Sequence, residues 1–245
     1  MSPGADSEHM ITLAIIAVLI AALVVAARRR PGDWTMPAGR VLAIVIFANE
    51  AGWWVWLAFQ HTWSISYALP LHLCDVAAFV ASAALWTRRP VLVELTYFWG
   101  LAGTSNSLVT PDLADHFPRY LFFQYYIAHG AIVAAALFLV FGLRITPRRG
   151  AVARVVALTL ALAAFDSVAN LMTGGNYMYL RHAPGVHSLL DLMGPWPWYV
   201  IGAAGLALAL FAVLYLPFWV GRRLALQPPV RPPISPTAVS GDRQR

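Results

Sequence analysis

The stretch ITLAIIAVLIAALVVAARRR, residues 11–30, has no charged residue until it ends in three consecutive arginines. A helix needs about 20 apolar residues to cross a hydrocarbon layer about 30 Å thick. The whole chain is 60% hydrophobic and 11% charged, with a mean hydropathy of +0.65, which is too apolar for an ordinary soluble domain. We therefore predict an all-α, polytopic membrane protein with seven transmembrane helices, at residues 10–27, 41–59, 67–86, 91–109, 120–143, 151–173 and 196–220.

The basic residues indicate the orientation. All 17 of them are arginine, and the chain has no lysine. If the N-terminus lies outside and the C-terminus lies in the cytoplasm, only Arg119 and Arg181 fall on the outer side. This distribution follows the positive-inside rule. The basic composition is thus explained by topology, and we expect no nucleic-acid partner.

The domain organisation is simple. Residues 1–9 are expected to be a short extracytoplasmic N-terminus, 10–220 a seven-helix membrane domain, and 221–245 a disordered, proline-rich cytoplasmic tail. The first apolar run lacks a preceding basic region, so we interpret it as a retained span and not as a signal peptide. A single cysteine excludes an internal disulfide.

Polar side chains inside the spans are candidates for function, because they are costly in a membrane interior. At 1.5 Å per residue, Cys74 and Asp166 would lie about 10 Å from the outer ends of their helices, and Glu50 and His129 about 14 Å. Further polar groups lie nearer the same side, with the last of them at the outer entrance to the seventh span: His72, Asp75, Asn106, Gln124, Asn170 and Asp191. Glu94 lies at the inner end, near Arg88 and Arg89. This distribution predicts a polar cavity that opens toward the outer leaflet.

Helical geometry suggests which groups cooperate. His72 and Asp75 are three residues apart and share a helix face, so Asp75 could orient the His72 ring. Cys74 points about 200° away from His72. A base for its thiol would therefore come from another helix, and His129 has a compatible depth. Taken singly, each of these residues also has a structural interpretation, as an interhelical hydrogen-bonding group or a small buried side chain.

Several strings carry a resemblance to a known family. They are LPLHLCD (69–75), YFWGLAGTSNSLVTPDL (97–113), FPRYLFFQYYIAHG (117–130), NYMYLRHAP (176–184) and SLLDLMGPWPWY (188–199). These strings resemble the YwaF-like bacterial integral membrane proteins, which are similar, more distantly, to the eukaryotic transmembrane protein 164 family. The resemblance implies a phospholipid acyltransferase with a cysteine acyl intermediate, in which Cys74 is the nucleophile and His129 the base.

Other functional classes are alternatives to an acyltransferase. A retinal protein needs a lysine for its Schiff base, so retinal is excluded as a partner. A metal-dependent lipid hydrolase would use His72, Asp75, His129 and Asp166, but no paired histidine spacing occurs within a span. A transporter or ligand-binding protein with buried carboxylates stays open as an alternative, as does an outward-facing sensor. We expect a multi-pass protein of the cell membrane that acts on membrane lipids, without cofactor or metal.

Overall fold

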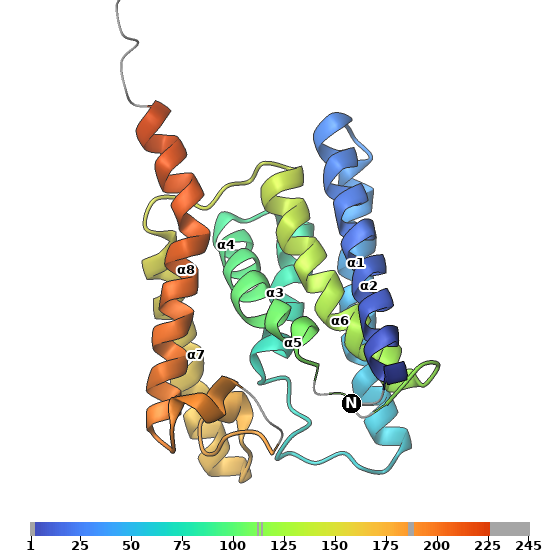
Figure 1. The fold of residues 1–245 in the computed structure, drawn as a ribbon, viewed down its shortest axis with the longest axis vertical. Helices are drawn as coiled ribbons and strands as arrows, with labels where there is room; N and C mark the ends of the chain where they lie inside the picture. Colours follow the sequence, from blue (N-terminus) through green and yellow to red (C-terminus); the bar gives the residue numbers. More distant parts are fainter. Residues whose placement is uncertain (1–2, 112, 114, 186–188, 226–245) are drawn as a thin grey trace, which may run out of the picture.

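The computed structural model describes residues 3–111, 113, 115–185 and 189–225, and this part of the chain contains helices and no strand. Figure 1 shows a bundle with α1 and α2 on one side, α3 to α6 in the middle, and α7 and α8 on the other side. The helices are α1 (Pro3–Arg29), α2 (Thr35–Phe59), α3 (Leu73–Thr87), α4 (Pro90–Trp99), α5 (Ser105–Val109), α6 (Tyr120–Leu137), α7 (Ala151–Thr173) and α8 (Trp198–Ala225). The described residues also form two π-helical turns, η1 (Gly100–Thr104) and η2 (Phe138–Gly142), and two 3₁₀ turns, η3 (Tyr177–Tyr179) and η4 (Leu189–Met193).

Five of the helical segments are long and apolar enough to cross a membrane. They are Ser7–Arg29, Thr35–Phe59, Tyr120–Gly142, Ala151–Thr173 and Trp198–Ala225. The predicted all-helical membrane class is therefore confirmed. The other two expected spans, at residues 67–86 and 91–109, are helical but shorter or interrupted. The first is α3, which has only 15 residues, and the second is divided into α4, η1 and α5.

The start of α3 differs most from the prediction. We expected a helix over 67–86, but α3 begins at Leu73. Pro70 would lie beyond the first turn of a helix that started at residue 67, where its ring and its missing N–H disrupt helical hydrogen bonding. Asp75 accepts a hydrogen bond from the main-chain N–H of His72 at 3.2 Å, and this contact caps the helix at its observed start.

Four other boundaries also move. The second helix begins at Thr35 and not at residue 41. The first helix already begins at Pro3, within the segment expected to be a short N-terminus. The last helix starts at Trp198, just after Pro197, and continues to Ala225. Residues 221–225 of the expected tail are thus the end of α8, and the rest of that tail lies outside the described residues.

Small residues let the central helices approach one another. Ala77, Ala81 and Ala84 of α3 are fully buried, and α3 packs against α2, α4 and α6. A Cβ atom on Gly100 of η1 would lie 3.3 Å from the Cβ atom of Ala136 in α6. Close packing through small side chains is typical of helices that associate within membranes. It brings η1 and α5 close to α3 and α6.

Glu94 has other partners than we expected. Its side chain is only 1% exposed, and it binds Arg148 and Arg154, with the shortest contacts at 2.9 Å in both pairs. The sequence placed Arg88 and Arg89 nearest, but the segment before α7 folds back over the start of α4. Hydrogen bonds to Glu94 raise the pKa of Arg148 above its usual value. This network ties α7 to α4 at the arginine-rich end of the bundle.

Candidate functional site

Cys74, the only cysteine of the chain, is the second residue of α3. The residue as a whole is partly exposed. The hydroxyl groups of Thr104, in η1, and Ser107, in α5, are close enough to interact with the thiol.

Three ionisable side chains from three helices lie near one another beside this cysteine. Glu50 of α2 interacts electrostatically with both Cys74 and His129. Asp75 of α3 interacts with Glu50, Cys74 and His129. Glu50 is almost fully buried, whereas Cys74, Asp75 and His129 keep part of their surface accessible. Cys74 and His129 therefore have two carboxyl groups as common neighbours. These four residues, with Thr104 and Ser107, are called the Cys74 cluster below.

The His129 ring has a defined orientation. Its Nδ1 atom lies 2.8 Å from the main-chain carbonyl oxygen of Tyr125. The centroids of the His129 and Tyr125 rings are 4.2 Å apart. A carbonyl oxygen can only accept, so Nδ1 donates and carries the proton of the neutral ring. The Nε2 atom is then left with a lone pair, as a general base requires.

The outer groups His72 and Asp75 do not interact as the sequence suggested. His72 precedes α3, and its ring packs against Tyr177 and Tyr179, with centroid distances of 5.3 and 5.7 Å. The Asp75 carboxylate binds the main-chain N–H of His72, and in the described residues we find no hydrogen bond from it to the imidazole. The aspartate thus positions the start of α3 instead of the ring.

Asp166 and Asn170, both in α7, are fully buried. The Asn170 side chain forms hydrogen bonds with the main chain of Tyr177, and the Tyr177 hydroxyl donates to the carbonyl of Ile65 at 2.7 Å. Burial raises the pKa of that hydroxyl. Neither carboxylate oxygen of Asp166 has a hydrogen-bond partner within the described part of the chain.

The remaining predicted residues lie in less central positions. Asn106 is exposed, and its carbonyl accepts from the Thr110 hydroxyl. The carbonyl of Gln124 accepts from the Asn49 side chain at 3.1 Å. Asp191 is exposed in η4. For Asn106 and Gln124, the contacts that we find among described residues involve their main chains and not the Cys74 cluster.

Sequence reasoning missed the hydroxyl groups of Thr104 and Ser107. Thr104 is fully buried, and its hydroxyl forms no hydrogen bond of ordinary geometry among the described residues. A polar run, TSNS, directly after the glycines of the fourth span was the available signal. A π-helical turn at this point is itself a feature that occurs often at functional sites.

Within the described residues, no group of three histidine, cysteine, aspartate or glutamate side chains could hold a metal ion. The cluster instead combines one thiol, one oriented imidazole, two carboxyl groups and two hydroxyl groups.

These features define a helical, polytopic membrane protein with a polar cluster at the start of a short central helix. The chain belongs to the TMEM164 family, whose family model matches residues 5–215. It is also similar to an uncharacterised protein of Treponema pallidum, strain Nichols, with 29% identity over 150 residues, which is 61% of this chain. The chain spans 62% of the length of that relative. No solved structure matches it.

Proposed function

We propose that this protein transfers an acyl group from a membrane lipid, through a thioester on Cys74, with His129 as the general base. The observation that carries the proposal is the orientation of His129: its Nδ1 donates to the Tyr125 carbonyl and leaves Nε2 free, within the cluster of carboxyl groups that adjoins the Cys74 thiol. Cysteine acyl transfer needs such a thiol and such a base.

The proposed reaction has two halves. In the first, His129 Nε2 takes the proton of the thiol, Sγ attacks the ester carbonyl carbon, and the C–O bond breaks. The departing alcohol, a lysolipid, takes the proton from His129. In the second, an acceptor hydroxyl or water gives its proton to His129 and attacks the thioester, the C–S bond breaks, and the thiolate regains the proton. The buried Thr104 hydroxyl is a suitable donor to the developing oxyanion.

Two features support a lipid as the substrate. Cys74 is the second residue of α3, so the depth of about 10 Å expected for a helix that began at residue 67 does not apply. In the proposed orientation Cys74 lies near the outer end of its helix, toward the polar boundary of the membrane where phospholipid headgroups lie. A groove of about 660 Å³ runs between α1 and α6, and its lining is almost entirely apolar. It includes Gly130, the residue after His129, together with Ile16 and Phe122. A groove of this kind suits an acyl chain better than a polar solute.

The wider setting of the proposal follows from the sequence. We place the chain among the YwaF-like bacterial members of its family, in the cell membrane, with seven spans, the N-terminus outside and the C-terminus in the cytoplasm. In this orientation the Cys74 cluster faces the outer leaflet. Membrane lipids are then its partners.

A trapped intermediate provides the test. Vesicles that contain the purified protein and phosphatidylcholine with an alkyne-tagged acyl chain should give a labelled protein, and hydroxylamine at neutral pH should remove the label. Because Cys74 is the only cysteine, a thioester has only one place to form. Cys74→Ala should lose the label, and a hydroxylamine-sensitive label of equal strength on this variant would refute the proposal.

A second candidate function is transport or binding of a small solute. The observation in its favour is Asp166, which is fully buried and whose carboxylate oxygens have no partner in the described residues. A carboxylate in that position must be protonated or must bind something. Proton-coupled uptake that survives Cys74→Ala but is lost in Asp166→Asn or Glu50→Gln would favour the transporter over the acyltransferase.

A further inference from the structure

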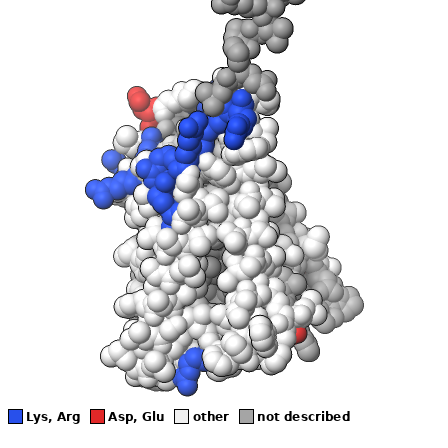
Figure 2. All heavy atoms as spheres, turned by 90° about the vertical axis from the view of Figure 1, so that its left-hand side faces the viewer, with Lys and Arg blue, Asp and Glu red and all other residues white. Residues whose placement is uncertain are grey.

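The arginine-rich end of the bundle carries a second candidate site, remote from Cys74. Figure 2 shows arginine side chains gathered near one end of the face formed by α7 and α8, above a broad surface with almost no charge. The 15 residues of α3 separate Cys74 from this end by about 20 Å of helix rise. The two regions can therefore be tested independently.

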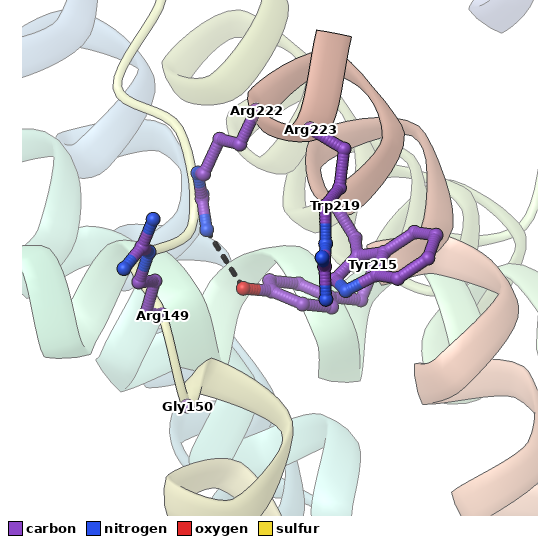
Figure 3. Close-up of a pocket in the computed structure, with 6 residues that line it drawn as sticks. All are labelled: Arg149, Gly150, Tyr215, Trp219, Arg222 and Arg223. Atoms are coloured by element: carbon purple, nitrogen blue, oxygen red, sulfur yellow. Dashed lines mark hydrogen bonds between the residues drawn. The ribbon is translucent and has the colours of Figure 1, made fainter. Parts of the chain in front are cut away.

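A pocket of about 500 Å³ opens among these arginines. It lies between the segment that precedes α7 and the last turns of α8, and Figure 3 shows the side chains around it. Its lining consists of Arg149, Gly150, Tyr215, Trp219, Arg222 and Arg223. Three guanidinium groups and two aromatic rings thus surround one opening.

The positive charge of this pocket is not balanced within the described part of the chain. Glu94 is the buried carboxylate at this end, and it is already bound by Arg148 and Arg154. We find no ion pair in the described residues for Arg149, Arg222 or Arg223. Like charges brought together repel one another unless an anion lies between them.

Two of the three arginines are held in position. Arg222 donates to the Tyr215 hydroxyl at 2.7 Å and to the carbonyl of Pro147. The guanidinium of Arg223 lies over the Trp219 ring, 5.0 Å from its centroid. A guanidinium has five N–H donors, so donors remain for a ligand after these contacts. Because the side chains are already ordered, a ligand would cost them little conformational entropy.

We propose that this pocket binds the phosphate of an anionic phospholipid headgroup. Arginine is suited to phosphate because its planar donors can bind two oxygens at once. The choice of a lipid over a soluble phosphate rests on the surroundings of the pocket: Leu216, Trp219 and Val220 of α8 are exposed beside it and offer an apolar surface to the acyl chains. Basic pockets between helices at a membrane surface bind such headgroups.

The test uses the purified full-length chain and soluble short-chain lipids. Thermal unfolding is followed while dihexanoyl phosphatidylglycerol, dihexanoyl phosphatidylcholine or glycerol 3-phosphate is added at constant ionic strength. We expect the anionic lipid to raise the melting temperature in a saturable manner, as a ligand of the folded state does. The other two compounds should have no saturable effect over the same concentrations.

Paired variants locate the effect. Arg149→Gln combined with Arg223→Gln should raise the phosphatidylglycerol concentration needed for half of the shift at least tenfold. The control, Arg29→Gln combined with Arg30→Gln, removes the same charge from exposed positions. It should change the phosphatidylglycerol concentration at half of the melting-temperature shift less than twofold. If the double pocket variant does not fold, Arg149→Gln alone replaces it, with at least a threefold change expected.

The proposal has clear ways to fail. Equal shifts by phosphatidylglycerol and phosphatidylcholine would refute recognition of the headgroup charge. Equal losses in the pocket and control variants would show a diffuse surface attraction instead of a site. A saturable shift by glycerol 3-phosphate equal to that of the lipid would refute the lipid and assign the pocket to a soluble phosphate compound. None of these readouts depends on Cys74.

Discussion

Asn170 and Tyr177 bind each other through two reciprocal hydrogen bonds. The Asn170 side-chain amide donates to the Tyr177 carbonyl at 3.0 Å, and the Tyr177 main-chain N–H donates to the Asn170 side-chain oxygen at 2.7 Å. Tyr177 in turn contacts the segment that leads to α3, through its hydroxyl, which donates to Ile65 and accepts from the N–H of Leu69 at 3.1 Å. The end of α7 thereby supports the approach to Cys74.

The first prediction concerns this pair. Asn170→Ala should lower the free energy of unfolding by about 2 kcal/mol, because it leaves a buried N–H and a buried carbonyl without partners. Thermal unfolding in detergent measures the change. Ser167→Ala, an exposed position in the same helix, is the matched control and should change the stability by less than about 0.5 kcal/mol. An equally small change for Asn170→Ala would contradict a supporting role.

The second prediction concerns the base. His129→Asn should abolish thioester formation, by at least about 100-fold in rate, because removal of a general base costs 10²–10⁴-fold. The asparagine amide can still donate to the Tyr125 carbonyl in place of Nδ1, so the fold should be kept. The rate of labelling with the alkyne-tagged lipid measures the loss. Labelling at the normal rate would exclude His129 as the base and leave the role of Cys74 to be judged separately.

The third prediction concerns Glu94. Glu94→Gln should destabilise the protein by about 2 kcal/mol, less than the 3–5 kcal/mol of a fully buried pair, because Arg148 and Arg154 are partly exposed. Asp33→Asn makes the same chemical change on the surface and serves as the control. Melting curves at low and high salt should show the loss for Glu94→Gln at both, since a buried carboxylate is screened little. An effect that disappeared in high salt would point to a surface ion pair.

The fourth prediction tests close packing at the π-helical turn. Gly100→Val should lower stability by about 1–3 kcal/mol through overpacking, because a Cβ atom there would meet Ala136 at 3.3 Å and the Ile132 side chain at 3.4 Å. Gly205→Ala in α8 is the contrasting variant, since its Cβ would contact nothing within 4 Å. It should stabilise the helix by about 0.5–1 kcal/mol. Equal responses at both positions would argue against close contact between η1 and α6.

Some features were determined by the sequence alone. The long apolar runs predict helices because each run must satisfy its own main-chain hydrogen bonds in lipid, and α7 begins and ends at the predicted residues, Ala151–Thr173. The concentration of arginine at the ends of runs is equally local. The candidate residues Cys74, Glu50, Asp75 and His129 could also be recognised, because polar groups within apolar runs are conspicuous.

Only the tertiary structure decided which of these residues meet. Thr104 and Ser107 neighbour Cys74 because a π-helical turn carries them toward α3, and no local pattern announces that turn. Glu94 binds Arg148 and Arg154, which are more than fifty positions away, instead of the adjacent arginines. The physical reason is the same in each case: hydropathy depends on the residues of one segment, whereas an ion pair or a hydrogen bond depends on how distant segments pack.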